Sequence, residues 1–182
     1  PWEVLISTVL SQRTRDDRTD EAAQALLARY PTARELAGAV VEDVERIIRP
    51  VNYYRTKAGR VIEIARTVLE RFGARVPATL DELVSLPGVG RKTANCVLVY
   101  GFGAGAIPVD THVHRISNRL GWVKTESPEE TERELWKLIP EAWVRRVNDL
   151  LVKHGQIVCR PIGPKCDRCG VEEYCASREL GS

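Results

Sequence analysis

Apolar residues recur along almost the whole chain at the three- and four-residue spacing of an amphipathic helix. The first such face carries Trp2, Leu5, Ile6, Val9 and Leu10. Strand-like alternation is confined to the short stretch Ile107–Val109. The pattern therefore predicts an all-α fold of roughly nine or ten helices with short connections. Because the helical pattern is already under way at Pro1, we expect that a preceding segment has been trimmed.

Helix boundaries are marked by capping residues. A Ser or Thr followed three residues later by Glu predicts a helix start, because the two side chains satisfy amide groups that have no partner within the helix. This pattern occurs at Thr32/Glu35, Thr79/Glu82 and Ser127/Glu130. Glycines that follow a periodic stretch predict helix ends, here for helices at about 54–72, 110–120 and 141–154. These glycines are Gly73, Gly121 and Gly155.

Composition and charge narrow the class of protein. The 182 residues are 43% hydrophobic, which is enough to build a core. The formal net charge is only +2, so the overall charge does not by itself indicate nucleic acid. No apolar run approaches the roughly 18 to 20 residues that a membrane span needs. We expect a monomer without a membrane partner, located in the cytoplasm and associated with the nucleoid if the source is a prokaryote.

Four of the five cysteines lie in a C-terminal segment that is rich in Pro and Gly and poor in periodic apolar residues. Cys159, Cys166, Cys169 and Cys175 follow the spacing C-x6-C-x2-C-x5-C. A bound metal centre would supply the folding energy that such a segment lacks. Zinc sites usually contain two close C-x2-C pairs, so an iron–sulfur cluster fits this spacing better. Zinc and four free thiols remain alternatives.

The other candidate ligands read as structural residues. Cys96 lies among apolar helical residues, where a buried thiol is ordinary. His154 precedes the cysteine segment, but four thiolates already complete a ligand set. The basic residues between the cysteines, Arg160, Lys165 and Arg168, would either meet DNA phosphates or stay solvated.

A glycine-containing turn, Leu86-Pro87-Gly88-Val89-Gly90-Arg91-Lys92, separates two predicted helices. Gly88 and Gly90 permit backbone angles that other residues avoid and let amide groups approach a ligand closely. A helix that begins directly after them adds partial positive charge, so the turn could bind a phosphate. A plain connector is the alternative.

At this point the chain resembles the endonuclease III family. The string from Leu86 to Asn95 is similar to its helix-hairpin-helix, Val109–Arg115 to the segment with its catalytic aspartate, and the cysteine spacing to its cluster loop. The resemblance extends to Pro1–Leu10 and Tyr54–Ala58. It implies two helical domains with a DNA-binding cleft between them. Residues 1–104 would carry the hairpin and residues 105–182 a loop with a [4Fe-4S] cluster.

The resemblance also implies the catalytic residues. Lys92 would be the nucleophile that attacks C1′ of the sugar, expels the base and forms a Schiff base, after which β-elimination nicks the strand. Asp110 would be its carboxylate partner, and it could stabilise positive charge on the sugar, assist proton movements, or do both. Without the resemblance, Asp110 would be interpreted as a plain helix N-cap.

The implied partner is double-stranded DNA with a damaged or mismatched base or an abasic site, which must be flipped out of the duplex. Two loops, Gln12–Arg13 and Asn52–Tyr54, would fill the gap, with Tyr53 as a wedge; ordinary helix connections are the alternative. Arg13 resembles a residue of mismatch-processing relatives. The further DNA contacts implied are Gly88, Gly90, Arg91, His112 and Arg115.

Three functions remain open. The leading hypothesis is a bifunctional base-excision DNA glycosylase with abasic-site lyase activity on oxidised pyrimidines. The second is a uracil or thymine mismatch glycosylase of the same superfamily. The third is a noncatalytic iron–sulfur module that binds DNA.

Overall fold

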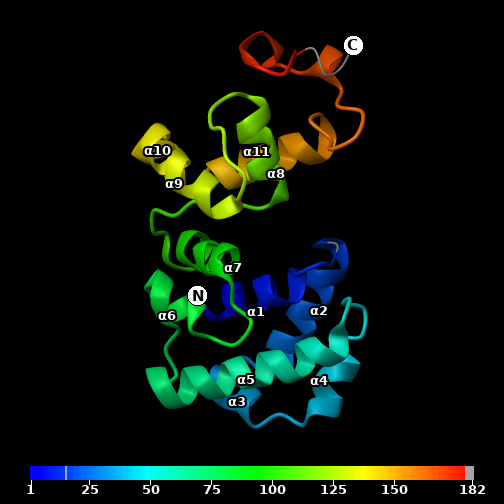
Figure 1. Cartoon of the computed structure of the whole chain (residues 1–182). Helices are drawn as coiled ribbons and strands as arrows, with labels where there is room; N and C mark the ends of the chain where they lie inside the picture. Colours follow the sequence, from blue (N-terminus) through cyan, green and yellow to red (C-terminus); the bar gives the residue numbers. More distant parts are fainter. Residues whose placement is uncertain (15, 179–182) are drawn as a thin grey trace. The chain divides into compact units, whose positions relative to one another are not determined.

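The computed structural model describes residues 1–14 and 16–178. These residues contain helices and no strand, which confirms the predicted all-α fold (Figure 1). The chain divides into two compact units, Pro1–Ala104 and Gly105–Ser182. Among the described residues, no helix combines the length and apolar character that crossing a membrane requires.

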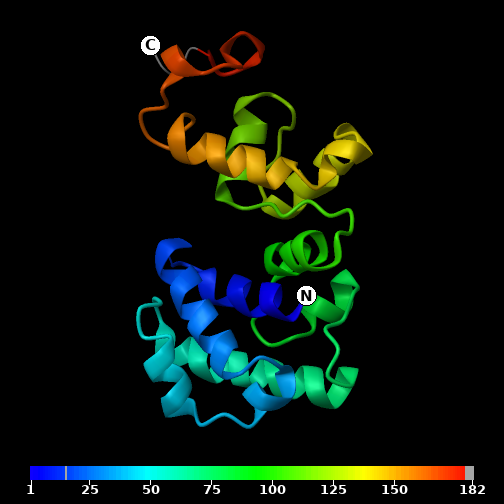
Figure 2. The same cartoon turned by 180° about the vertical axis from the view of Figure 1, so that it is seen from behind.

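The first unit is built around its longest helix, α5 (Tyr54–Phe72). The other elements are α1 (Trp2–Ser11), α2 (Asp16–Arg29), α3 (Ala33–Ala37), α4 (Val41–Ile47), α6 (Leu80–Val84), α7 (Arg91–Cys96) and the π-helical turn η1 (Val97–Gly101). Val61, Ile64 and Val68 of α5 are fully buried. They lie on one helical face, and α5 packs against α1, α3 and α4 (Figure 2).

The predicted helix boundaries of this unit have the expected chemistry. Thr32 Oγ1 accepts a hydrogen bond from the amide of Glu35 at 3.3 Å, and Glu35 Oε2 accepts one from the amide of Thr32 at 3.0 Å. The capping box at the start of α3 is therefore complete. At the C-terminal end of α5, Gly73 adopts a left-handed conformation with φ +60°, which glycine tolerates best.

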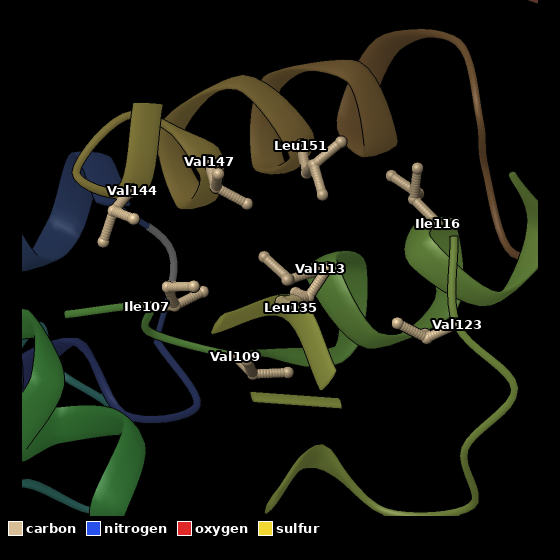
Figure 3. Close-up of a cluster of buried hydrophobic side chains, with 9 residues drawn as sticks. All are labelled: Ile107, Val109, Val113, Ile116, Val123, Leu135, Val144, Val147 and Leu151. Carbon is tan, nitrogen blue, oxygen red and sulfur yellow. The ribbon is translucent and has the colours of Figure 1, made fainter. Parts of the chain in front are cut away.

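The second unit contains the cluster of buried side chains shown in Figure 3. Its elements are α8 (Thr111–Arg119), α9 (Pro128–Leu138), α10 (Glu141–Val144), α11 (Val147–Ile157) and two 3-10 turns, η2 (Cys166–Arg168) and η3 (Glu172–Tyr174). Val113 and Ile116 of α8 meet Leu151 of α11 in this core. The stretch Ile107–Val109 is not part of a strand; Ile107 and Val109 are buried in the same core.

Gly155 corrects one predicted helix boundary. The helix expected at about 141–154 is divided into α10 and α11, and Gly155 lies inside α11. A Cβ atom there would lie 2.4 Å from His112 Nδ1 and 2.9 Å from Ile116 Cδ1. Gly155 therefore lets α11 approach α8 closely. A glycine is needed here for helix packing and does not end the helix.

Candidate functional site

The turn between α6 and α7 is held by its own apolar residues. Leu86 and Val89 are 2% and 4% exposed, and the Val89 amide donates to the Leu86 carbonyl at 3.1 Å. Gly88 has φ +66°, a conformation that L-residues rarely adopt. The hairpin predicted from the two glycines is therefore present, and α7 begins at Arg91 directly after it.

The two hairpin glycines serve different purposes. A Cβ atom on Gly88 would lie only 1.6 Å from Nη1 of Arg60, so the α5 guanidinium lies directly against the turn. Gly90 has φ −85° and nothing within 4 Å of the position where a Cβ would lie. The left-handed backbone of Gly88 therefore favours glycine there, whereas the space beside Gly90 is open to a ligand.

Lys92 lies in the first turn of α7 with its side chain exposed. In the part of the chain that the structure describes, no hydrogen bond or ion pair engages its ammonium group. The next residue, Thr93, is 5% exposed and anchors the helix. The amine is therefore available for chemistry on a backbone that is fixed.

Three segments that are far apart in the sequence meet near this hairpin. The side-chain amide of Gln12 donates to the carbonyl of Gly88 at 3.2 Å and to Thr93 Oγ1 at 3.3 Å. Asn52 Nδ2 donates to the carbonyl of Arg13 at 2.7 Å. Hydrogen bonds thus join the two loops predicted to fill the gap in the duplex, Gln12–Arg13 and Asn52–Tyr54. They also tie the first of these loops to the hairpin.

One residue in each of the two loops predicted to fill the gap in the duplex has an unusual backbone. Arg13 has φ 54° and Tyr53 has φ 58°, so both non-glycine residues are left-handed. Such a conformation costs roughly 1–2 kcal/mol per residue and persists only where surrounding contacts enforce it. Both side chains are exposed, and the exposed fraction of Tyr53 is 63%. Strain of this kind concentrates at functional sites.

Lys57 is part of this region, although nothing in the sequence analysis pointed to it. Its ammonium, on a residue only 7% exposed, donates to the carbonyls of Leu10 at 2.6 Å and Gln12 at 2.5 Å and to Thr14 Oγ1 at 3.0 Å. Burial lowers the pKa of Lys57 from 10.5 to about 8. A sequence signal did exist, because Lys57 falls on the helical face of Val61, Ile64 and Val68.

In the second unit, Asp110 is the N-cap of α8. Its Oδ1 accepts hydrogen bonds from the amides of His112 and Val113, each at 2.9 Å. Among the described residues, no hydrogen bond reaches the second carboxylate oxygen, Oδ2. Both interpretations of Asp110 are therefore compatible: one oxygen caps the helix and fixes the carboxylate, and the other can face a ligand.

His112 and Arg115, predicted to contact DNA, have partners within the protein. Arg115 Nη2 donates to the carbonyl of Cys159 at 2.8 Å and lies 3.1 Å from His112 Nδ1. Burial, and then the charge of Arg119, lowers the pKa of Arg115. The His112 ring lies against Gly155. These contacts link α8 to the start of the cysteine segment, and a role in DNA contact stays a prediction.

All four cysteines of the C-terminal segment line one cavity, whose apolar wall includes Ile116, Leu120 and Val158. Each is free of a disulfide bond. In the described residues, no group of three or more His, Cys, Asp or Glu side chains could hold a single metal ion. Cys96 is buried in the first unit and is not among the residues that line this cavity. Four thiols spread around one cavity suit a multi-iron cluster better than a zinc ion.

Arg119 of α8 organises this cavity, and the sequence analysis did not identify it. Its Nη1 donates to Cys159 Sγ at 3.4 Å and to the Arg160 carbonyl at 2.6 Å, while Nη2 donates to the Pro161 carbonyl at 2.9 Å. The thiol of Cys175 donates to the Arg119 carbonyl at 3.4 Å. His154 Nε2 lies 3.8 Å from Cys169 Sγ, and burial lowers the pKa of His154.

Comparison with known proteins identifies the family. Residues 6–141 match the model of the HhH-GPD superfamily of base excision DNA repair proteins. The chain is 53% identical over 175 residues to endonuclease III of Thermotoga maritima, which covers 96% of this chain and 82% of the relative.

Solved structures agree with the sequence relatives. The fold matches a trapped covalent intermediate of endonuclease III with DNA at a TM-score of 0.90 and 34% identity, covering 97% of this chain and 84% of the other. A thermostable thymine-DNA glycosylase matches at 0.87 and 27% identity, covering 99% and 85%. The chain therefore belongs to the HhH-GPD superfamily of base excision DNA repair proteins and, within it, to the endonuclease III family of DNA glycosylase/AP lyases.

Proposed function

We propose that this protein is a bifunctional glycosylase that removes oxidised pyrimidines from duplex DNA and uses Lys92 as its nucleophile. One observation carries the proposal: Lys92 is exposed directly after the hairpin, and no described residue pairs with its amine. An unpaired amine on a fixed backbone suits attack on a sugar carbon.

The reaction needs one amine and one carboxylate. The neutral Lys92 amine forms a bond to C1′, and the bond from C1′ to the base breaks, so that the base departs. Opening of the sugar ring gives a protonated Schiff base, which acidifies the C2′ proton. Loss of that proton breaks the bond from C3′ to its phosphate oxygen and nicks the strand. Oδ2 of Asp110 would stabilise the positive charge on the sugar.

Duplex DNA is the proposed partner, supported by the likeness to endonuclease III in complex with DNA. The open space beside Gly90 would admit a phosphate, and Arg91 follows it at the start of α7. Arg13 and Tyr53 would enter the gap that the everted nucleotide leaves. The expected monomeric state and cytoplasmic location stay predictions.

We further propose that Cys159, Cys166, Cys169 and Cys175 hold a [4Fe-4S] cluster, as is typical of the endonuclease III family. The bound cluster would cross-link the C-terminal segment and so supply folding energy. Arg119 would donate to the sulfur of Cys159 while it holds the two carbonyls that follow. Arg115 would fix the carbonyl of Cys159 itself.

A thymine or uracil mismatch glycosylase is the second candidate. The likeness to a thermostable thymine-DNA glycosylase favours it, as does Arg13 in the first loop. Lys92 favours the bifunctional enzyme, because a glycosylase that activates water needs no amine.

Product analysis on three matched duplexes distinguishes the candidates. One duplex contains thymine glycol, one a G·T mismatch and one an abasic site. The proposal predicts nicking of the thymine glycol duplex without alkali, with an unsaturated aldehyde at the 3′ end. Release of thymine from the mismatch with nicking only after alkali would support the second candidate. Duplex binding without base release or nicking would contradict both.

A further inference from the structure

Lys57 is a buried cation that the proposed reaction does not use. Its side chain is on the core-facing side of α5, where the neighbours Ala58, Val61 and Ile64 are fully buried. No described carboxylate forms an ion pair with it. A methionine could fill the same space without the desolvation cost of a charge, so the three hydrogen bonds of the ammonium are what a lysine adds at this position.

Two of those contacts are with carbonyls where α1 ends and the Gln12–Thr14 loop begins. Leu10 and Gln12 present carbonyls at the C-terminal end of α1, which has no basic residue in its last turn and no left-handed glycine to cap it. Lys57 donates to both carbonyls from another helix. Such carbonyls attract a cation because they have no partner within the helix. Lys57 thus caps α1 and fixes the point where the Gln12–Thr14 loop begins.

The third contact reaches the second loop. Thr14 Oγ1 accepts from Lys57 at 3.0 Å and from the amide of Asn52 at 3.2 Å. The side-chain amide of Asn52 in turn donates a hydrogen bond to the carbonyl of Arg13. One ammonium group therefore joins the two segments that contain Arg13 and Tyr53, each a non-glycine residue in a left-handed conformation. Strained conformations survive only where such contacts over-determine them.

The same network reaches the hairpin. The backbone carbonyl of Gln12 accepts from Lys57, while its side chain donates to Gly88 and Thr93. Gln12 is thereby fixed at both ends.

We infer that Lys57 is a positioning residue that holds the Gln12–Thr14 and Asn52–Tyr53 loops in the conformation that enters the duplex beside an everted nucleotide. This inference rests on the proposed function. It predicts a role confined to duplex substrates. An abasic site in single-stranded DNA has no stacked and paired neighbours to displace, so it does not need the two loops.

The test compares Lys57→Met with the wild type on two substrates of the same sequence, a duplex and a single strand, each with one abasic site. Lys137→Met is the matched control, because Lys137 is an exposed lysine of α9. We expect Lys57→Met to lower kcat/KM for nicking of the duplex by about tenfold or more, as loss of charge-assisted hydrogen bonds implies. Nicking of the single strand should change by less than about threefold.

Two further variants separate positioning from folding. Lys57→Arg keeps the charge and should recover part of the duplex activity. Thr14→Val removes the link to Asn52 without changing a buried charge and should lower duplex activity in the same direction but less. Equal losses on duplex and single strand, or full duplex activity in a folded Lys57→Met protein, would overturn the inference.

A readout without turnover keeps this test separate from the proposed function. Fluorescence of 2-aminopurine placed beside the abasic site reports unstacking when protein binds the duplex. Wild type and Lys137→Met should raise this fluorescence at saturation, and Lys57→Met should raise it less. An equal rise in all three would overturn the inference. A wild type that raises the fluorescence but nicks neither substrate would contradict the proposed lyase and leave the role of Lys57 supported by the fluorescence difference.

Discussion

The side-chain amide of Gln12 donates to the carbonyl oxygen of Gly88 at 3.2 Å and so ties the loop after α1 to the hairpin turn. A second bond, to Thr93 Oγ1, reaches the residue next to Lys92. Gln12 was predicted to contact DNA, but in this structure its amide joins two parts of the site. Its position makes the geometry around Lys92 depend on a loop that is 80 residues earlier in the chain.

We therefore expect Gln12→Ala to lower kcat/KM on a duplex substrate roughly five- to 150-fold, since two hydrogen bonds of about 0.5–1.5 kcal/mol each are lost. Steady-state nicking of an abasic duplex measures the effect. Gln24→Ala is the control, because Gln24 is exposed on α2. Wild-type kinetics in the Gln12 variant would show that the link has no catalytic consequence.

Alanine substitutions at the two hairpin glycines should affect different properties, stability at Gly88 and duplex binding at Gly90. Gly88→Ala is expected to cost about 1–3 kcal/mol of unfolding free energy, because its φ is +66° and its Cβ would overlap Arg60. Gly90→Ala should leave stability within about 0.5 kcal/mol, because its backbone is ordinary and the space beside it is open. It should nevertheless weaken duplex binding, because the new methyl group occupies the space proposed for a phosphate.

Urea unfolding and duplex Kd, measured on the same two proteins, decide this prediction. Arg60→Ala in the Gly88→Ala background should recover the steric part of the loss and leave the part due to φ. Unchanged duplex binding by Gly90→Ala would remove the phosphate from the space beside Gly90.

Lys57 should give the protein a distinctive pH dependence. Its pKa falls from 10.5 to about 8 on folding, so between these values the unfolded chain binds a proton that the folded chain has released. Raising the pH through this window therefore increases the contribution of Lys57 to stability, and below about pH 8 that contribution is constant. The free energy of unfolding of wild type relative to Lys57→Met should rise from pH 8 to pH 10. If the free energies of unfolding of the two proteins changed in parallel with pH, the lowered pKa of Lys57 would be contradicted.

The cluster proposal predicts that a chromophore and stability are lost together. Cys169→Ser should abolish visible absorbance and lower the Tm, because a bound cluster would cross-link a segment that has little core of its own. Cys96→Ala should keep the absorbance, since Cys96 is buried in the first unit. A colourless Cys169→Ser protein with the wild-type Tm would show that the cluster is not structural.

Features decided by neighbours in the sequence were predictable. The capping box of Thr32, the left-handed end at Gly73 and the hairpin at Gly88 follow from local chemistry, and the structure has all three. Gly155 was misread because a glycine that ends a helix and one that lets two helices touch give the same sequence signal.

Features decided by distant segments were not predictable. The burial of Lys57 follows from its place on the apolar face of α5, but its carbonyl partners, about 45 residues earlier in the chain, could not be identified from the sequence. Arg115 turns to the carbonyl of Cys159, 44 residues later, and so was assigned to DNA without knowledge of that contact. Arg119 likewise has a role only once the cysteine segment folds back on α8.

Borohydride trapping identifies the nucleophile, because reduction of a Schiff base fixes the enzyme to its DNA. The wild type, Lys92→Gln and the control Lys137→Gln would each be incubated with a duplex that contains one abasic site. We predict a covalent adduct for wild type and control, and none for Lys92→Gln despite retained duplex binding. An adduct that persists undiminished in Lys92→Gln would contradict the assignment of Lys92 as the nucleophile.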